Sequence, residues 1–102
     1  MLVKVRLIGV GDALAEYGVH EGDEVVGETP TKESVAKALS YEDLSTCGLT
    51  EEDILFHMVR DNVIICYFCR KEKGGKKIKS KYQKEEAFIF KPNRYEILEI
   101  IS

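Results

Sequence analysis

The chain has 102 residues, of which 44% are hydrophobic and 32% are charged, and its formal net charge at pH 7 is −3. This composition excludes a disordered chain and suits one domain with a modest core. No apolar run reaches the roughly 20 residues that a membrane helix needs, and the N-terminus lacks the layout of a signal peptide. We therefore expect a single domain, residues 1–102, that acts in the cytoplasm without a membrane.

The N-terminal part of the chain predicts two strands. Residues 1–8 alternate between apolar and charged side chains, a period of two that is typical of a half-buried strand. Gly9-Val10-Gly11-Asp12 ends this strand, and residues 13–17 are expected to form a single helical turn or a loop. Gly22-Asp23 is a compact turn signal directly before a second predicted strand at 24–28.

A helical section follows the second strand. The Thr-Pro pair at 29–30 predicts a helix to about Leu39, because Thr is a good N-cap and Pro is favoured at the first helical position. Ser40 and Thr50 each precede an acidic residue by three positions, as in a capping box. They predict a short helix after Ser40 and a longer one at about 51–60. The apolar face of the longer helix is expected to consist of Ile54, Leu55, Met58 and Val59.

The strongest strand signal lies in the second half of the chain. Val63–Cys69 is a run of seven β-branched, aromatic or sulfur-containing residues. The Gly74-Gly75 pair supplies the positive φ angles that a tight reversal needs. The stretch from Asn62 to Phe90 therefore predicts a long hairpin with a basic tip. A turn at 91–94 then leads to a last strand, Tyr95–Ile101.

These elements together predict an α+β fold. We expect a small, mainly antiparallel sheet or an SH3-like barrel, with a helical insertion at about residues 30–60 between the second and third strands. The first and last strands are expected to pair, because neither buries its apolar face alone.

Segments near the two ends of the chain carry a resemblance to a known group. They are Val3–Ile8, Gly18–Val25, Phe88–Pro92 and Tyr95–Glu99. They resemble very short SH3-like β-barrel proteins of Gram-positive bacteria and their phages, in which a Gly-Asp turn precedes the second strand and an aromatic-Pro turn precedes the last. The helical middle, Thr29–Arg60, departs from this pattern. The resemblance implies binding rather than catalysis and identifies no functional residue.

Charge is unevenly distributed along the chain. Acidic side chains dominate residues 1–69, whereas basic side chains dominate residues 70–84, which we name the basic hairpin. Its candidate binding residues are Arg70, Lys71, Lys73, Lys76, Lys77, Lys79, Lys81, Tyr82 and Lys84. Because lysines contact phosphate largely without reading sequence, they predict weak, salt-sensitive binding of nucleic acid. The alternative interpretation is a tip that is kept soluble by its charge.

An acidic face is expected on the helices. Its candidate binding residues are Glu42, Asp43, Glu51, Glu52 and Asp53. The N-terminal region adds Asp12, Glu16, Glu21, Asp23, Glu24 and Glu28. These carboxylates predict either a surface that docks on a basic partner, or solvated side chains and helix caps.

Cys66 and Cys69 have the C-x-x-C spacing of a zinc site, for which Cys47 and His57 are the remaining candidate ligands. In a regular strand, however, Cys66 and Cys69 point to opposite faces, and the second half of a four-Cys motif is missing. We therefore expect buried thiols, and neither a metal nor a cofactor. The absence of a nucleophile motif or a nucleotide fingerprint favours a protein that is not an enzyme.

The function expected from these features is that of a small binding or regulatory protein, such as an inhibitor encoded by a phage or a mobile element. It would dock on a host protein or nucleoprotein complex through its charge-separated surface. The alternatives are a nucleic-acid-binding module that uses the basic hairpin, and a small zinc-binding protein.

Overall fold

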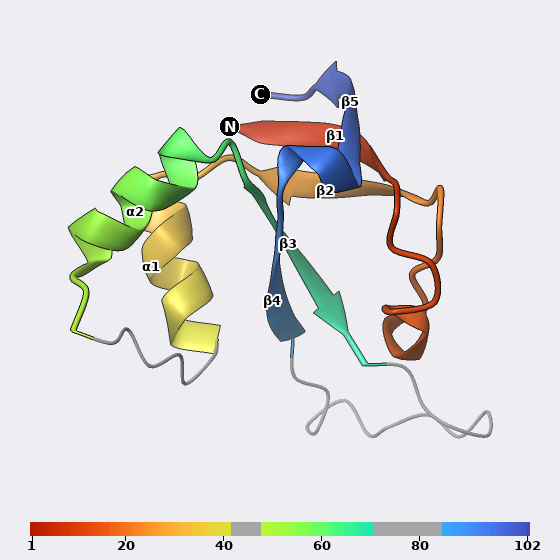
Figure 1. The fold of residues 1–102 in the computed structure, drawn as a ribbon, viewed down its shortest axis with the longest axis horizontal. Helices are drawn as coiled ribbons and strands as arrows, with labels where there is room; N and C mark the ends of the chain where they lie inside the picture. Colours follow the sequence, from red (N-terminus) through yellow and green to blue (C-terminus); the bar gives the residue numbers. More distant parts are fainter. Residues whose placement is uncertain (42–47, 71–84) are drawn as a thin grey trace.

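A computed structural model describes residues 1–41, 48–70 and 85–102. The strands form one open antiparallel sheet in the order β4-β3-β2-β1-β5, with β4 and β5 at its edges (Figure 1). Their bounds are β1 Leu2–Leu7, β2 Glu24–Glu28, β3 Ile64–Cys69, β4 Glu85–Phe90 and β5 Tyr95–Ile100. The helices α1, Lys32–Tyr41, and α2, Glu51–Arg60, lie between β2 and β3 in the chain. The predicted α+β fold with a helical insertion between the second and third strands is confirmed.

The alternation predicted for the first strand holds in β1. Val3, Val5 and Leu7 are buried, whereas the side chains between them reach the outer face. The turn before β2 docks on the end of the same strand, because Leu7 exchanges backbone hydrogen bonds of 2.8 and 2.9 Å with Gly22 and Asp23. The expected helical turn at 13–17 is a short 3-10 helix, η1, Ala15–Tyr17.

The predicted pairing of the first and last strands is also confirmed. A second 3-10 helix, η4, Pro92–Arg94, turns the chain into β5, which pairs with β1. Val5 lies opposite Ile97 and Val3 lies opposite Ile100, with a register shift between them. Because of this shift, Ile97 and Ile100 are both opposite residues of β1 that face the core.

The sheet is strongly bent where β2 meets β3. These strands pair through Glu28 and Ile65, and β3 and β4 cross the direction of β1 and β2 steeply (Figure 1). Gly27 lies at the crossing, where an added Cβ would be 3.0 Å from the Ile64 Cδ1 atom and 3.2 Å from the Cys66 sulfur. The absence of a side chain at Gly27 therefore permits the close approach of the two strands.

Two hydrophobic clusters lie on opposite sides of β3. The main core contains Val3, Val5, Leu7, Leu14, Val19, Ile64, Cys66 and Phe90. The smaller cluster joins β3 and β4 to the helices through Ile65, Ala38 and Ala87, with Met58 and Tyr67 packed against it. Because β3 is covered on both faces, its sequence is continuously apolar rather than alternating.

The start of α1 differs from the prediction. We expected Thr29 to cap the helix and Pro30 to open it, but the cap is Thr31 and the helix begins at Lys32. The Thr31 hydroxyl accepts a hydrogen bond of 3.0 Å from the Ser34 N–H, and the Ser34 hydroxyl accepts one of 2.7 Å from the Thr31 N–H. This reciprocal pair has the geometry of a capping box and fixes the helix start two residues later.

The predicted helix start at Ser40 is wrong. The helix α1 continues through Ser40 to Tyr41, and the Ser40 hydroxyl donates a hydrogen bond of 2.6 Å to the Lys37 carbonyl oxygen. A Ser side chain that bonds back to its own helix is not available as a cap. Residues 42–47, where that helix was expected to continue, lie outside the described residues.

The start of α2 agrees with the prediction. The Thr50 hydroxyl accepts a hydrogen bond of 3.1 Å from the Asp53 N–H, and the Asp53 carboxylate accepts one of 3.3 Å from the Thr50 N–H. Ile54, Leu55 and Met58 are half-buried, so the helix lies shallowly on the rest of the molecule. Within the described ranges, no helix is long and apolar enough to cross a lipid bilayer.

Candidate binding surface

Of the residues in the basic hairpin, the structure describes Arg70. The Arg70 guanidinium contacts Tyr17 and Glu16 of η1. It lies 5.6 Å from the centre of the Tyr17 ring, donates a hydrogen bond of 3.3 Å to the Tyr17 hydroxyl and lies 3.8 Å from a carboxylate oxygen of Glu16. The hydrogen bond with Tyr17, followed by nearby negative charge, raises the pKa of Arg70. The Tyr17 hydroxyl in turn donates to Glu86. The remaining residues of the predicted site, Lys71 to Lys84, lie outside the described residues.

The predicted acidic face divides into side chains with different roles. Asp53 belongs to the capping box of α2, so its carboxylate is engaged in capping that helix. Glu51 and Glu52 are exposed, and no ion pair within the described residues involves them. They border a cleft of about 560 Å³ whose other lining residues include Val35 and Leu55. Glu42 and Asp43 lie outside the described part of the chain.

Glu21 is bound by the loop that follows β1. Its carboxylate accepts hydrogen bonds of 2.7, 2.7 and 2.9 Å from the backbone N–H groups of Gly9, Val10 and Gly11. These hydrogen bonds, chiefly those from Gly11 and Gly9, lower the pKa of Glu21. The Arg94 guanidinium adds a favourable charge and donates to the Gly9 carbonyl oxygen. Glu21 therefore holds the loop together and is not a free docking group.

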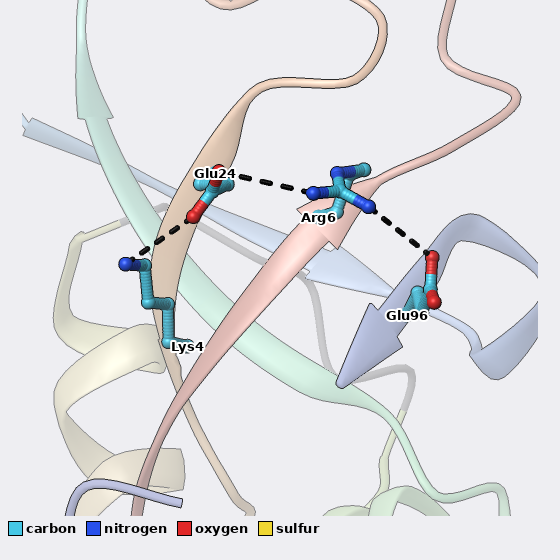
Figure 2. Close-up of polar contacts among 4 residues, drawn as sticks. All are labelled: Lys4, Arg6, Glu24 and Glu96. Atoms are coloured by element: carbon cyan, nitrogen blue, oxygen red, sulfur yellow. Dashed lines mark ion pairs between the residues drawn. The ribbon is translucent and has the colours of Figure 1, made fainter. Parts of the chain in front are cut away.

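The outer face of β1, β2 and β5 carries a chain of cross-strand ion pairs (Figure 2). Glu24 lies 3.2 Å from the Lys4 ammonium and 3.9 Å from the Arg6 guanidinium, and Arg6 also lies 3.8 Å from Glu96. Exposed pairs of this kind contribute little stability individually. They compensate the charges of Glu24 and Glu96, so the acidic N-terminal region is not a uniform acidic surface.

The cysteines of the C-x-x-C pair differ in environment. Cys66 is fully buried in the main core, and burial raises the pKa of its thiol to about 12. Cys69, three positions further along β3, is half-buried. His57 is exposed on α2 and packs edge-on against Phe56. Among the described residues, His, Cys, Asp and Glu form no group of three or more that could hold a metal, and Cys47 lies outside them.

An apolar groove lies between β5 and the junction of α2 with β3. We name it the β5 groove; its volume is about 250 Å³. Val3 and Ile64 of the main core belong to its lining. The lining residues are Met1, Val3, Thr29, Pro30, Val59, Asn62, Val63, Ile64, Tyr95, Ile97 and Ile100. The groove therefore lies directly over buried residues of the main core.

Three apolar side chains that border the β5 groove are unusually exposed for their type. Ile97 is 54% exposed, Ile100 is 61% exposed and Val59 is 53% exposed. Ile97 and Ile100 lie opposite buried residues of β1, so they extend the core face of the sheet beyond the part that the rest of the chain covers. Tyr95 lines the same groove, and its hydroxyl donates a hydrogen bond of 2.6 Å to the Asn62 carbonyl oxygen.

Sequence reasoning did not identify the β5 groove. Its exposed apolar residues were assigned to the last strand and to the apolar face of a helix, where they would be covered. A signal was nevertheless present in Ile97-Leu98 and Ile100-Ile101, because a half-buried strand at a sheet edge needs apolar residues at alternate positions and not in adjacent pairs.

Comparisons of the chain with protein-family models, with curated proteins and with solved structures find no match.

Proposed function

We propose that this chain is a non-enzymatic binding protein that docks on a partner protein. The observation that carries the proposal is the β5 groove, where Ile97, Ile100 and Val59 are exposed around an apolar hollow. Contiguous exposed apolar surface of this kind is characteristic of interaction sites, because water contact with it is unfavourable until a partner covers it. An exposed side chain outside the groove carries no such meaning; Val26, for example, is 50% exposed and lies opposite Lys4 in the sheet.

The charges of the described surface favour a basic partner. Glu51, Glu52 and Glu99 are exposed carboxylates that form no ion pair with a described residue. A basic protein, or the protein component of a nucleoprotein complex, would compensate them on docking. The function that we infer is regulatory: a small cytoplasmic protein of a phage or mobile element that modifies a host complex by covering part of it.

We further propose an SH3-like arrangement of the strands. The order β5-β1-β2-β3-β4 supports it, because each strand lies beside its neighbour in the chain and the last strand returns to the first. The Gly22-Asp23 turn before β2 and the η4 turn before β5 agree with the resemblance that the chain ends carry. The insertion of α1 and α2 is the part that departs from it.

Affinity capture with matched variants tests the proposed function. The tagged chain would be compared with Ile97→Lys, which places a charge in the β5 groove, and with Val26→Lys, which places the same charge on the outer face of β2. We expect a discrete partner protein to be retained by the wild type and by Val26→Lys, and to be lost with Ile97→Lys. Retention by the wild type and both variants would contradict a role for the groove, and so would loss with both lysine variants, which would indicate a general charge effect.

A further inference from the structure

We propose that the β5 groove receives an extended segment of the partner, which adds a strand to the edge of β5 that no described strand covers and carries alternating apolar side chains together with a basic one. This inference rests on the proposed function and names the kind of partner surface. Its three supports are this edge of β5, the direction of the side chains along that edge, and the charge beside it.

The first support is backbone geometry. Strand β5 pairs with β1 on one side, and none of the described strands pairs with its other side. The backbone N–H and C=O groups that point away from β1 are therefore arranged to bond a further strand. Binding by strand addition uses these main-chain groups for affinity and the adjacent side-chain pockets for specificity.

The second support is the position of the groove relative to this edge. The lining of the groove includes Tyr95, Ile97 and Ile100 from β5, together with Val59, Asn62 and Val63 from the junction of α2 with β3. Because successive side chains of a strand point to opposite faces, a strand laid along β5 would direct every second side chain over the groove. Apolar side chains at those positions would cover the exposed Ile97 and Ile100.

The third support is charge. Glu99 lies on the same strand opposite Lys4, but the Lys4 ammonium pairs with Glu24 at 3.2 Å, and no described residue forms an ion pair with Glu99. A basic side chain on the outer face of an added strand would compensate this carboxylate, since cross-strand pairs of opposite charge are favourable.

The same charges argue against a second copy of this chain as the occupant. The segment Tyr95–Ile101 contains Glu96 and Glu99 and no basic residue. Two such strands paired side by side would bring together two Glu99 carboxylates that form no ion pair with a described residue, and they would add no basic side chain to compensate them, which opposes association. A partner strand with Lys or Arg avoids this cost.

A peptide-display selection tests the inference. The chain would be immobilised and exposed to a library of random peptides long enough to span β5. We expect enrichment of peptides in which apolar residues alternate with residues that include Lys or Arg. A selected peptide should perturb the amide NMR signals of Ile97 and Ile100 and slow hydrogen exchange along β5.

Matched controls separate strand addition from simple apolar binding. Methylation of the peptide N–H groups that face β5 removes the hydrogen bonds, and we expect it to weaken binding about tenfold or more, given about 1 kcal/mol for each bond lost. Ile97→Lys should abolish binding, Glu99→Gln should weaken the binding of basic peptides, and Val26→Lys should leave binding unchanged. Equal binding of the methylated peptide would overturn strand addition.

Two further outcomes are decisive. Failure to enrich alternating basic peptides, while Ile97→Lys still loses the cellular partner, would refute the extended segment and leave the proposed function standing. Sedimentation that shows a dimer of the wild type and a monomer of Ile97→Lys would identify a second copy as the occupant and overturn the inference.

Discussion

The hydroxyl of Tyr95 donates a hydrogen bond of 2.6 Å to the carbonyl oxygen of Asn62. This bond joins the first residue of β5 to the turn between α2 and β3, which are far apart in the chain. Asn62 has a φ of 52°, the left-handed conformation that Asn tolerates better than most residues. The two residues line the same groove, so their bond joins two of the segments that form it.

Removal of the Tyr95 hydroxyl is expected to weaken the connection between β5 and the turn at Asn62. Tyr95→Phe should lower the free energy of unfolding by about 1 kcal/mol, the usual net value of one such hydrogen bond. Urea unfolding followed by circular dichroism measures this loss.

The contribution of Tyr95 should also depend on pH. Burial raises the pKa of Tyr95, so the folded state favours the protonated phenol. The stabilisation is present below the ordinary tyrosine pKa of about 10 and is lost as the pH rises through the higher folded value. The difference between wild type and Tyr95→Phe should therefore shrink in strong alkali.

Glu21 is predicted to control the acid stability of the N-terminal loop. Glu21→Gln removes the charge that three backbone N–H groups bind, so it should lower the melting temperature at neutral pH. Because the pKa of Glu21 lies below the ordinary 4.5, its stabilisation is present above 4.5 and is lost as the pH falls through the folded value. Melting temperatures of the two proteins should therefore converge in acid.

Asp12→Asn is the matched control for Glu21→Gln. Asp12 is an exposed carboxylate of the same loop, and no ion pair of the described residues includes it. Its neutralisation should change the melting temperature little at any pH. An equal effect of the two substitutions would mean that the loop responds to net charge and not to the bound carboxylate.

Gly27→Ala is expected to destabilise the crossing of β2 and β3. The added methyl group would lie 3.0 Å from Ile64 Cδ1 and 3.2 Å from the Cys66 sulfur, both of which belong to the packed core. Overpacking of this kind costs about 1–3 kcal/mol. Ile64→Val removes the Cδ1 atom, so the double variant should lose less stability in urea than the sum of the two single variants. Simple additivity would contradict a steric origin.

Most elements were predictable because their signals are local. The alternation of residues 2–7, the Gly22-Asp23 turn and the Thr50 capping box each depend on side chains within a few positions of one another. The start of α1 was misplaced because two competing caps, Thr29 and Thr31, lie two residues apart. The choice depends on Ser34, whose buried hydroxyl also donates to the Thr29 carbonyl oxygen.

The candidate site was not predictable because it depends on which part of the sheet the rest of the described chain leaves uncovered. Val59 and Ile97 have the sequence environment of core residues, and their exposure follows from the shallow position of α2 and from the edge position of β5. Likewise, the acidic residues differ in role through distant partners: Glu21 meets the loop after β1, and Glu24 meets Lys4 and Arg6. Composition alone assigns all of them to one acidic surface.

The nucleic-acid alternative makes a separate prediction for the basic hairpin. If it binds phosphate, fluorescence anisotropy with mixed-sequence DNA and RNA should show weak binding at low salt that declines steeply as salt rises. Charge reversal at Lys76, Lys77 and Lys79 should abolish it. Charge reversal at Arg70 should have a smaller effect, because its guanidinium is engaged by Tyr17 and Glu16. No binding at low salt would exclude this function for the hairpin.

The two described cysteines should differ sharply in reactivity. Alkylation needs the thiolate, and burial raises the pKa of Cys66 to about 12 while the core encloses its sulfur. At neutral pH, iodoacetamide should therefore modify the half-buried Cys69 well before Cys66, as measured by mass spectrometry of peptides, and denaturant should remove the difference. Added zinc should protect neither residue. Equal protection of Cys66 and Cys69 by zinc would support the zinc-binding alternative, because both thiols would then have to face one metal.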